Sequence, residues 1–523
     1  MSGESHHGKG PNRGGLDQSG SEQGNMSAAD ALADAMTALK ERRYQDAEKR
    51  LAILHHLQPD DETIAFYLGF AQLQMGLPGK ALPLIARAVA ADGPLAQTVD
   101  AWVTLGSAAF QTGNLPPALA AHRKAVELAP DNAEAARTLG MVLLANREQS
   151  EALAELRRAR DLAPTNGRCW FSLVGATALS EQEQRQLAAL ADKVAAESAS
   201  APDAPFVLFA HALSIEKASP VDRMDALHRA NACVRADLPW SMEAERTIQT
   251  MALDHWDRTV DRFRPSLPMG TLHPQAIFVL GLPRSGTTLL ERMLDAHPAV
   301  TGGGESVAMM RAIHGTGLDP WSKRLCRTAR DRYWEAILSG HSDLGPEDLA
   351  GLTHVDKTPA NYRFLGQIRL CLPNARVIHL TRRTEDTALS CYEQFFAPGL
   401  MAWSYDPADI GRYFALYEHQ MNAWRDRIGP GYWFDLTYED LVGAPKETMT
   451  RLLDFLGLPW DDAVMAHHRR PGTVITAGRA QIANAVHARS IGRAEGYETF
   501  TDCVHQARKA EMDRLAEPKT DSP

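Results

Sequence analysis

The chain has few of the features that mark secreted, membrane-spanning or nucleic-acid-binding proteins. Its six cysteines are scattered without a C-x-x-C pair, which argues against a disulfide framework or a zinc site and favours a reducing compartment. No apolar stretch reaches the about 18–20 residues of a membrane span. The formal net charge of −10 argues against a nucleic-acid-binding face. We therefore expect a cytoplasmic protein with no membrane span and no nucleic-acid partner.

The N-terminal residues 1–27 also lack the apolar core of a secretory signal. They are rich in glycine, serine, asparagine and charge, and are expected to form a disordered tail. The 523 residues of the chain are enough for two or three domains with sizeable cores.

From about residue 28 the sequence repeats with a period of 34 residues. The residues one period apart are Ala35 and Gly69, Ala47 and Ala81, Gly106 and Gly140, Ala118 and Ala152, and Pro130 and Pro164. Small residues at this spacing suit the crossing of two antiparallel helices, and the pattern fits the tetratricopeptide repeat. We predict a helical repeat domain over 28–265, with four clear units to about residue 166, an insertion near Gly93 and degraded helical pairs from Trp170 onward.

Such an array presents a concave surface that can bind a protein or peptide partner. It is equally compatible with a dimerisation element, so that a homodimer is a second expectation. An alanine-rich helical bundle with accidental periodicity is the simpler alternative to repeats.

After Arg264 the pattern changes to short strands that alternate with helices, which predicts an α/β domain over 270–500 with a parallel sheet. Strands are expected at 276–280, 376–381 and 432–436, and helices at 287–296, 384–395, 406–427 and 446–456. Residues 501–523 are assigned to a C-terminal tail.

A glycine-containing loop connects the first of these strands to its helix. The strand–loop–helix order predicts a phosphate cradle, because backbone N–H groups and the positive end of the helix dipole converge on an anion. The loop nearly matches G-x-x-x-x-G-K-[ST], but Thr287 stands in place of the lysine and the cation is Arg284. The usual contacts to the β- and γ-phosphates of ATP are therefore not expected. A glycine turn that merely starts a helix is the alternative.

The segment 281–290, followed by Asp295-Ala296-His297-Pro298, resembles the 5′-phosphosulfate-binding loop of sulfotransferases. The resemblance is nearest to the tyrosylprotein sulfotransferase-like group and to bacterial members with tetratricopeptide repeats. It implies an α plus α/β fold class, in which a tetratricopeptide α-solenoid precedes a P-loop-like α/β sulfotransferase domain with a central parallel sheet.

The implied reaction transfers a sulfuryl group from 3′-phosphoadenosine 5′-phosphosulfate to a hydroxyl, without a metal. A protein or peptide, a saccharide and a small molecule are all compatible acceptors. The implied contacts to the 5′ end of the donor are Arg284, Ser285, Gly286, Thr287 and Thr288.

The donor's 3′-phosphate has a site of its own in this family. Arg382 directly follows the strand 376–381, and Ser390 lies eight residues later on the next helix. This spacing resembles the family's 3′-phosphate site, with Arg383 as the alternative if the register shifts by one. Tyr438, in the segment Thr437-Tyr438-Glu439-Asp440-Leu441, is implied to pack near the adenine.

Two further segments carry the implied catalytic residues. Glu305, after three glycines, resembles the carboxylate that accepts the acceptor's proton, and its alternative is a helix cap or an ion pair. Lys357, in Asp356-Lys357-Thr358-Pro359, resembles the lysine that stabilises the bridging oxygen, together with Arg284. A surface lysine is the alternative.

The resemblance weakens beyond residue 470. Gln481 is kept, but Gly478 replaces a serine and 483–485 replace Arg-Gln-Pro. His487, Arg489 and Ala494 stand where Tyr, Ser and Trp are expected, whereas Ser490, Gly492 and Arg493 remain. Because this segment is expected to close over the donor, Arg493 or His487 is predicted to take over that contact.

Two other functions stay open: a non-catalytic repeat scaffold with a degenerate donor site, and a P-loop kinase or nucleotidase.

Overall fold

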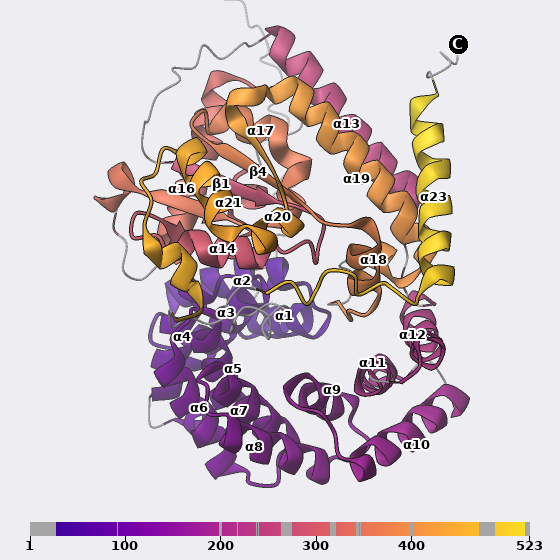
Figure 1. Ribbon diagram of the computed structural model, residues 1–523. Helices are drawn as coiled ribbons and strands as arrows, with labels where there is room; N and C mark the ends of the chain where they lie inside the picture. Colours follow the sequence, from indigo (N-terminus) through magenta and orange to yellow (C-terminus); the bar gives the residue numbers. More distant parts are fainter. Residues whose placement is uncertain are drawn as a thin grey trace, which may run out of the picture.

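The computed structural model describes residues 28–90, 93–197, 201–216, 218–236, 238, 240–262, 275–313, 321–340, 345, 347–396, 401–469 and 487–517. The predicted tail 1–27 and the divergent positions 478, 481 and 483–485 lie outside these residues. The described chain has two parts: an arc of helices over 28–235, and an α/β part over 275–517, joined by the helix 242–262, that rests on the arc (Figure 1).

The arc begins with four antiparallel helix pairs. Their bounds are α1 (Ala28–Lys40) and α2 (Tyr44–Leu57), α3 (Glu62–Gln74) and α4 (Pro78–Ala90), α5 (Val99–Gln111) and α6 (Leu115–Leu128), and α7 (Ala133–Ala145) and α8 (Gln149–Leu162). The periodic small residues lie where the helices cross, and Ala35, Ala47 and Ala81 are fully buried. A Cβ at Gly140 would lie 2.7 Å from Cγ of Leu156, so that only glycine allows this approach. The predicted repeat architecture is confirmed.

The arc continues beyond the fourth pair with α9 (Gly167–Ala176), α10 (Glu181–Glu197), α11 (Ala204–Ser214) and α12 (Pro220–Arg235). The next helix, α13 (Met242–Arg262), leaves the arc and packs on α19 (Pro407–Ile428) and α17 (Leu365–Cys371) of the second part, where Trp256 is buried in its core (Figure 1). The predicted insertion contains a short 3₁₀ helix, η1 (Pro94–Gln97). In the described part of the chain, no helix is both long and apolar enough to cross a membrane.

The second part is built on a sheet of five parallel strands in the order β2-β3-β1-β4-β5. The strands are β1 (Gln275–Leu280), β2 (Thr301–Gly302), β3 (Thr353–Asp356), β4 (Arg376–Thr381) and β5 (Trp433–Thr437). The helices include α14 (Thr287–Asp295), α15 (Ala308–Ile313), α16 (Lys323–Gly340), α17 (Leu365–Cys371), α18 (Thr384–Tyr392), α19 (Pro407–Ile428), α20 (Tyr438–Gly443) and α21 (Pro445–Leu456). The predicted α/β architecture with a parallel sheet is confirmed.

Both faces of the sheet are covered, which explains why β1 reads as a continuous apolar run. Phe278 and Leu280 point into a core shared with α16, α17 and α19. Ile277 and Val279 point into the opposite core, shared with α14 and α21. The chain leaves β1 toward β2 and β3 on one side, whereas β4 and β5 lie on the other, so a switch in strand order falls at the carboxyl end of β1. In open α/β sheets, ligands bind in the crevice that forms at such a switch point, at the carboxyl ends of the strands.

The arc contacts the second part near both of its ends, so that the backbone elements of the two parts form a closed ring (Figure 1). Near the first end, Arg311 of α15 donates a hydrogen bond to the backbone oxygen of Met75. Near the other end, Asn231 of α12 donates to the backbone oxygen of Tyr392 at 3.0 Å, and Arg235 pairs with Asp409 at 2.5 Å.

The C-terminal residues are more ordered than the predicted tail 501–523. Residues up to Ala516 belong to α23 (Glu498–Ala516), which packs along α19 (Figure 1). Phe500 and Val504 are buried in this contact. A Cβ at Gly411 would lie 2.2 Å from the backbone oxygen of Val504, so the two helices can approach only because residue 411 is glycine. The helix is therefore part of the second domain's packing.

Candidate functional site

The loop between β1 and α14 has the backbone of an anion cradle. Gly286 precedes the helix with φ of 103°, and Arg284 also has a positive φ of 70°. A Cβ at Gly281 would lie 2.6 Å from the backbone oxygen of Leu380, and one at Gly286 would lie 2.5 Å from the ring of Tyr438. The two glycines therefore keep the loop close to β4 and to Tyr438, with the N-terminus of α14 open to an anion.

The structure brings the predicted donor-site residues around this loop together. Nε of Arg284 donates to Oγ of Ser390 at 3.0 Å. Arg382 donates from Nη1 to the backbone oxygen of Arg284 at 3.0 Å, donates from Nη2 to the backbone oxygen of Ser490, and lies 4.9 Å from the ring centre of Tyr438. Arg382 and Ser390 thus both contact Arg284, Arg382 through its backbone oxygen and Ser390 through its Nε.

Arg284 and Arg382 form a local excess of positive charge. Burial lowers the pKa of both guanidinium groups, because desolvation disfavours their charged forms. Among the described residues, neither has a carboxylate within 4.0 Å, and Nε of Arg382 has no hydrogen-bond partner. Glu393 acts on Arg284, and Asp386 and Glu439 act on Arg382, only from beyond direct ion-pair contact. Partly buried cations that no carboxylate contacts directly favour the binding of an anion.

Arg493 differs from these two arginines. It pairs with Glu393 at 3.0 Å and lies 3.8 Å from Glu216, so that its charge is balanced by protein carboxylates. The backbone N–H groups of Gly492 and Ala494 donate to Asp386 of α18 at 2.9 and 3.0 Å. The segment around Arg493 is therefore held against α18, close to the loop but with its guanidinium already paired.

The remaining loop residues lie at the start of α14. Ser285 and Thr287 are buried, and Thr288 is half-buried. The Oγ of Ser285 would lie only 2.5 Å from a Cβ at Gly281, so this hydroxyl points back toward the end of β1.

Glu305 and Lys357 meet at the carboxyl ends of β2 and β3. Beyond the strands, Gly303 N donates to Val355 O at 2.8 Å and Lys357 N donates to Gly304 O at 3.0 Å. This pairing places Nζ of Lys357 2.7 Å from Oε1 of Glu305. The lysine side chain is 1% exposed and the glutamate side chain 53% exposed. The exposed-lysine alternative is thus incorrect, whereas Glu305 is an ion-pair partner with one side open.

Sequence reasoning missed a second carboxylate, Glu291, on the first turns of α14. It is buried, accepts a hydrogen bond from Gly304 N at 2.7 Å and lies 3.9 Å from Nζ of Lys357. Burial raises the pKa of its carboxyl group. In a single sequence, nothing distinguishes a glutamate that faces a functional site from any other glutamate of an amphipathic helix. Its position one turn after Thr287 and Thr288 is the only available indication, because that face of α14 must turn toward the site.

Asp356, next to Lys357 in the sequence, is a third carboxylate near this site. It is fully buried and accepts hydrogen bonds from Thr358 N at 3.1 Å and from Nδ2 of Asn361 at 3.0 Å. Burial raises the pKa of its carboxyl group from 3.8 to about 7. The folded protein therefore holds this proton more tightly than the unfolded chain does.

This difference predicts a pH effect on stability. Because the folded pKa of Asp356 is raised, its contribution to the free energy of unfolding falls as pH rises from about 4 to about 7, by at most about 4 kcal/mol. Asp356→Asn removes this titration, so we expect the variant to lose less stability than the native chain between pH 5 and pH 8. Urea unfolding at the two pH values measures the effect, with the exposed Asp331→Asn as control. Parallel losses in all three proteins would contradict it.

Comparison with known proteins assigns both parts of the chain. Residues 274–462 match the sulfotransferase family, and residues 32–96, 69–133 and 103–167 match the tetratricopeptide repeat. The molecule is therefore a repeat protein that carries a sulfotransferase-family domain, as the resemblance predicted.

Among curated proteins, the chain is similar to an uncharacterized protein of Aquifex aeolicus, with 30% identity over 58% of this chain and 41% of that protein. It is also similar to the protein-tyrosine sulfotransferase of Drosophila melanogaster, with 27% identity over 36% of this chain and 40% of that one. A putative protein-tyrosine sulfotransferase of Caenorhabditis briggsae is 23% identical over 46% of this chain and 86% of its own length. The match thus spans about two fifths of the length of the Aquifex aeolicus protein and of the Drosophila melanogaster protein.

Solved structures that resemble parts of the chain include the sulfotransferase domain of the Synechococcus PCC 7002 olefin synthase. Its identity is 16% and its TM-score 0.31, over 49% of this chain and 99% of that one. The tetratricopeptide protein YrrB has 18% identity and a TM-score of 0.28, over 38% of this chain and 94% of that one.

Proposed function

We propose that the protein transfers a sulfuryl group from 3′-phosphoadenosine 5′-phosphosulfate to the hydroxyl of an acceptor. The observation that carries the proposal is the pair of partly buried arginines, Arg284 and Arg382, that lie beside an anion cradle without a carboxylate within 4.0 Å among the described residues. A donor with phosphate groups at its 3′ and 5′ positions supplies the missing negative charge at two points. The sulfotransferase-family match of residues 274–462 supports the same donor.

The residues of the loop fit the 5′ end of this donor. Gly281 and Gly286 let the loop pack closely against β4 and Tyr438, and the N-terminus of α14 offers backbone N–H groups. Arg382 with Ser390 would hold the 3′-phosphate, with Arg284 close to both. Tyr438 would pack beside the adenine, and Arg493 would have to leave Glu393 before it reached the donor.

When bound, the donor supplies a sulfuryl group on a good leaving group. The acceptor oxygen forms the new S–O bond as the donor's bridging S–O bond breaks, and adenosine 3′,5′-bisphosphate leaves. Glu305, open on one side, takes the acceptor's proton. Lys357 and Arg284 stabilise the negative charge that develops on the bridging oxygen. Glu291 keeps Lys357 and Gly304 in place, since it contacts both.

Calorimetric titration of adenosine 3′,5′-bisphosphate, against 5′-AMP and ATP–Mg²⁺, tests the donor. We expect micromolar binding of the bisphosphate and at least about tenfold weaker binding of 5′-AMP, because the latter lacks the 3′-phosphate that Arg382 would hold. Tighter binding of ATP–Mg²⁺ would instead support a P-loop kinase or nucleotidase. No nucleotide binding would support a repeat scaffold with a degenerate donor site.

The repeat array supports a protein or peptide partner, because stacked helix pairs present an extended concave surface. In the ring, this surface faces the sulfotransferase-family domain.

A further inference from the structure

The end of α18 connects the anion cradle to the repeat array. On one side, Oγ of Ser390 accepts a hydrogen bond from Nε of Arg284 at 3.0 Å, and Sγ of Cys391 donates to a backbone oxygen of the loop between β1 and α14 at 3.3 Å. On the other side, the next two residues, Tyr392 and Glu393, contact α12 (Figure 1). One turn of chain thus holds the cradle with its first residues and the repeat array with its last.

The contact between α12 and α18 is part of one apolar core, to which both helices contribute. Beside this core, Nδ1 of His228 lies 2.6 Å from Oη of Tyr392. Nη2 of Arg223 lies 2.8 Å from Oε1 of Glu393, and the two side chains of this ion pair are only 7% and 8% exposed. An ion pair this deeply buried cannot lose one partner without a large loss of stability, because the other charge is left without compensation.

The carboxylate of Glu393 is shared with a second arginine. Its Oε2 lies 3.0 Å from Nη2 of Arg493, while its Oε1 is paired with Arg223. Arg493 is close to the cradle as well: burial lowers the pKa of Arg284 and of Arg382, and the charge of Arg493 contributes to both shifts. One buried carboxylate thus balances an arginine of the repeat array and the arginine that would move onto the donor.

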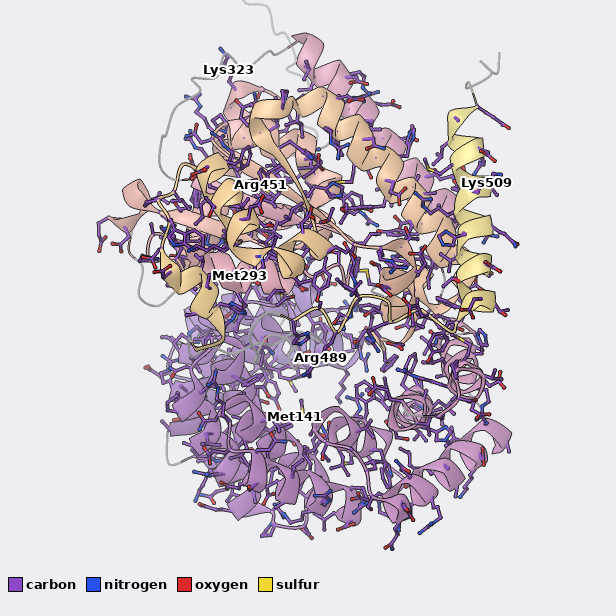
Figure 2. All side chains as sticks on the ribbon, in the orientation of Figure 1. Met141, Met293, Lys323, Arg451, Arg489 and Lys509 are labelled. Atoms are coloured by element: carbon purple, nitrogen blue, oxygen red, sulfur yellow. The ribbon has the colours of Figure 1, made fainter. Side chains whose placement is uncertain are left out.

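The segment that carries Arg493 lies between the two parts of the molecule. Figure 2 shows Arg489, on the same segment, between the arc and the second part. From the arc, Glu216 approaches Nη2 of Arg493 to 3.8 Å, and the side chain of this glutamate is 68% exposed. Release of Arg493 therefore costs little at Glu216, whose carboxylate water can solvate, but concerns a buried charge at Glu393.

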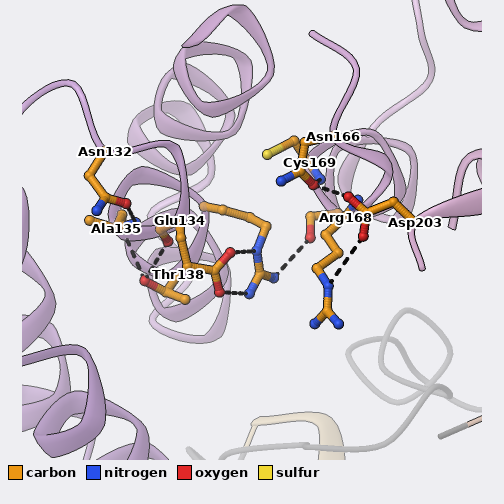
Figure 3. A network of polar contacts seen from close by, with 10 residues as sticks. Asn132, Glu134, Ala135, Thr138, Asn166, Arg168, Cys169 and Asp203 are labelled. Atoms are coloured by element: carbon orange, nitrogen blue, oxygen red, sulfur yellow. Dashed lines mark hydrogen bonds and ion pairs between the residues drawn. The ribbon is translucent and has the colours of Figure 1, made fainter. Parts of the chain in front are cut away.

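The position of Arg223 is fixed by the rest of the array. Its helix, α12, shares an apolar core with α9 and α11. Polar contacts join these helices as well: Arg168 of α9 lies 3.8 Å from Asp203 at the start of α11, and Asn166 caps the start of α9 (Figure 3). The array therefore presents Arg223 to the second part from a packed support.

We propose that Arg223, a residue of the repeat array, is a positioning residue for the donor: it keeps Glu393 compensated when Arg493 turns from Glu393 to the donor. The inference rests on the proposed function. With Arg223 in place, the buried carboxylate keeps one partner after Arg493 has left. Without Arg223, Glu393 either holds Arg493 back or remains as a buried charge beside an anionic donor, and both effects weaken donor binding. Donor affinity is thereby tied to the position of α12, and through it to the array.

The test is calorimetric titration of adenosine 3′,5′-bisphosphate into the full chain and its variants. Arg223→Met removes the charge and keeps most of the side-chain length. We expect it to weaken binding at least about tenfold, because release of Arg493 then leaves a buried charge unpaired. Arg223→Lys keeps the charge and should recover most of this loss. The control, Arg229→Met, changes an exposed arginine of the same helix that lies 3.3 Å from Asp192, and it should bind as the native chain does.

A double variant separates this role from simple support of α18. Glu393→Gln in the Arg223→Met background removes both charges of the pair, so that Arg493 is free to reach the donor. We expect binding in the double variant to return to within about twofold of the native value. A residue that only held α18 in place would not be rescued in this way, because the double variant lacks the same contact.

Two kinds of failure are distinguishable. If the native chain does not bind the bisphosphate, the proposed function is wrong and this inference falls with it. If the native chain binds it, then native affinity in Arg223→Met, or a loss that the double variant does not recover, would overturn the inference. Circular dichroism shows whether each variant folds. If Arg223→Met does not fold, Arg223→Gln, which can still donate a hydrogen bond to Glu393, takes its place, and the same loss to a smaller degree is expected.

Discussion

Glu305→Gln should lower kcat by about 10²–10⁴-fold, the usual contribution of a general base. Glutamine keeps the size of the side chain and a hydrogen-bond acceptor near Lys357, but it cannot take the acceptor's proton. Lys357 also keeps Glu291 at 3.9 Å, so we do not expect the buried lysine to lose all compensation. Affinity for adenosine 3′,5′-bisphosphate should change little. Single-turnover rates with a ³⁵S-labelled donor measure the chemical step separately from binding.

Glu335→Gln is the matched control for this experiment. Glu335, on α16, is exposed and lines the cavity that Glu305 also lines, between the repeat array and the second domain. No proposed step uses Glu335. If both glutamine variants retain native kcat, proton transfer does not depend on Glu305 and the assigned base is wrong. If both lose activity equally, the effect reflects the charge of the cavity rather than a proton acceptor.

Arg382→Ala should weaken adenosine 3′,5′-bisphosphate binding by about 10- to 150-fold, because one charge-assisted hydrogen bond contributes about 1.5–3 kcal/mol. The loss should be much smaller for 5′-AMP, since that nucleotide has no 3′-phosphate. The native preference for the bisphosphate should therefore largely disappear. Calorimetry with both nucleotides measures the difference directly.

Arg383→Ala distinguishes the assigned arginine from its neighbour. The side chain of Arg383 is 46% exposed and lies 3.9 Å from Glu385, whereas Arg382 contacts the cradle. We expect native binding in this variant. If Arg383→Ala loses the preference and Arg382→Ala keeps it, the register of the 3′-phosphate site is shifted by one residue. Circular dichroism checks that Arg382→Ala still folds without its bond to the backbone of Arg284.

The local structure of the site could be predicted from sequence because its signals are local. The strand β4 has the predicted bounds, 376–381, and α14 begins at the predicted Thr287. Both follow from a buried apolar run and a glycine at positive φ. The predicted helix 384–395 instead ends at Tyr392. Phe395 turns away to stack on Phe209 of the repeat array, with ring centres 5.3 Å apart, and nothing near it in the sequence indicates that contact.

The parts of the site that sequence could not provide depend on contacts between distant segments. The pairing of residues 303–304 with 355–357 brings Glu305 onto Lys357, and only the strand order determines it. Arg284 reaches Ser390 across 106 positions of the chain. Glu291 and Arg223 have no motif of their own, because their roles arise from the distant residues that they contact.

The contacts near both ends of the repeat array limit how this protein can vary. A solenoid with one free end can gain or lose a unit while the remaining units keep their neighbours. Here the array is held at Met75, in its second helix pair, and at Asn231 and Arg235 near its other end. An extra 34-residue unit between these anchors would move one of them away from its partner. The number of repeats is thereby tied to the size of the second domain. The length of the array between its two contacts is therefore fixed. A change in its curvature is what would widen the cavity between the array and the second domain.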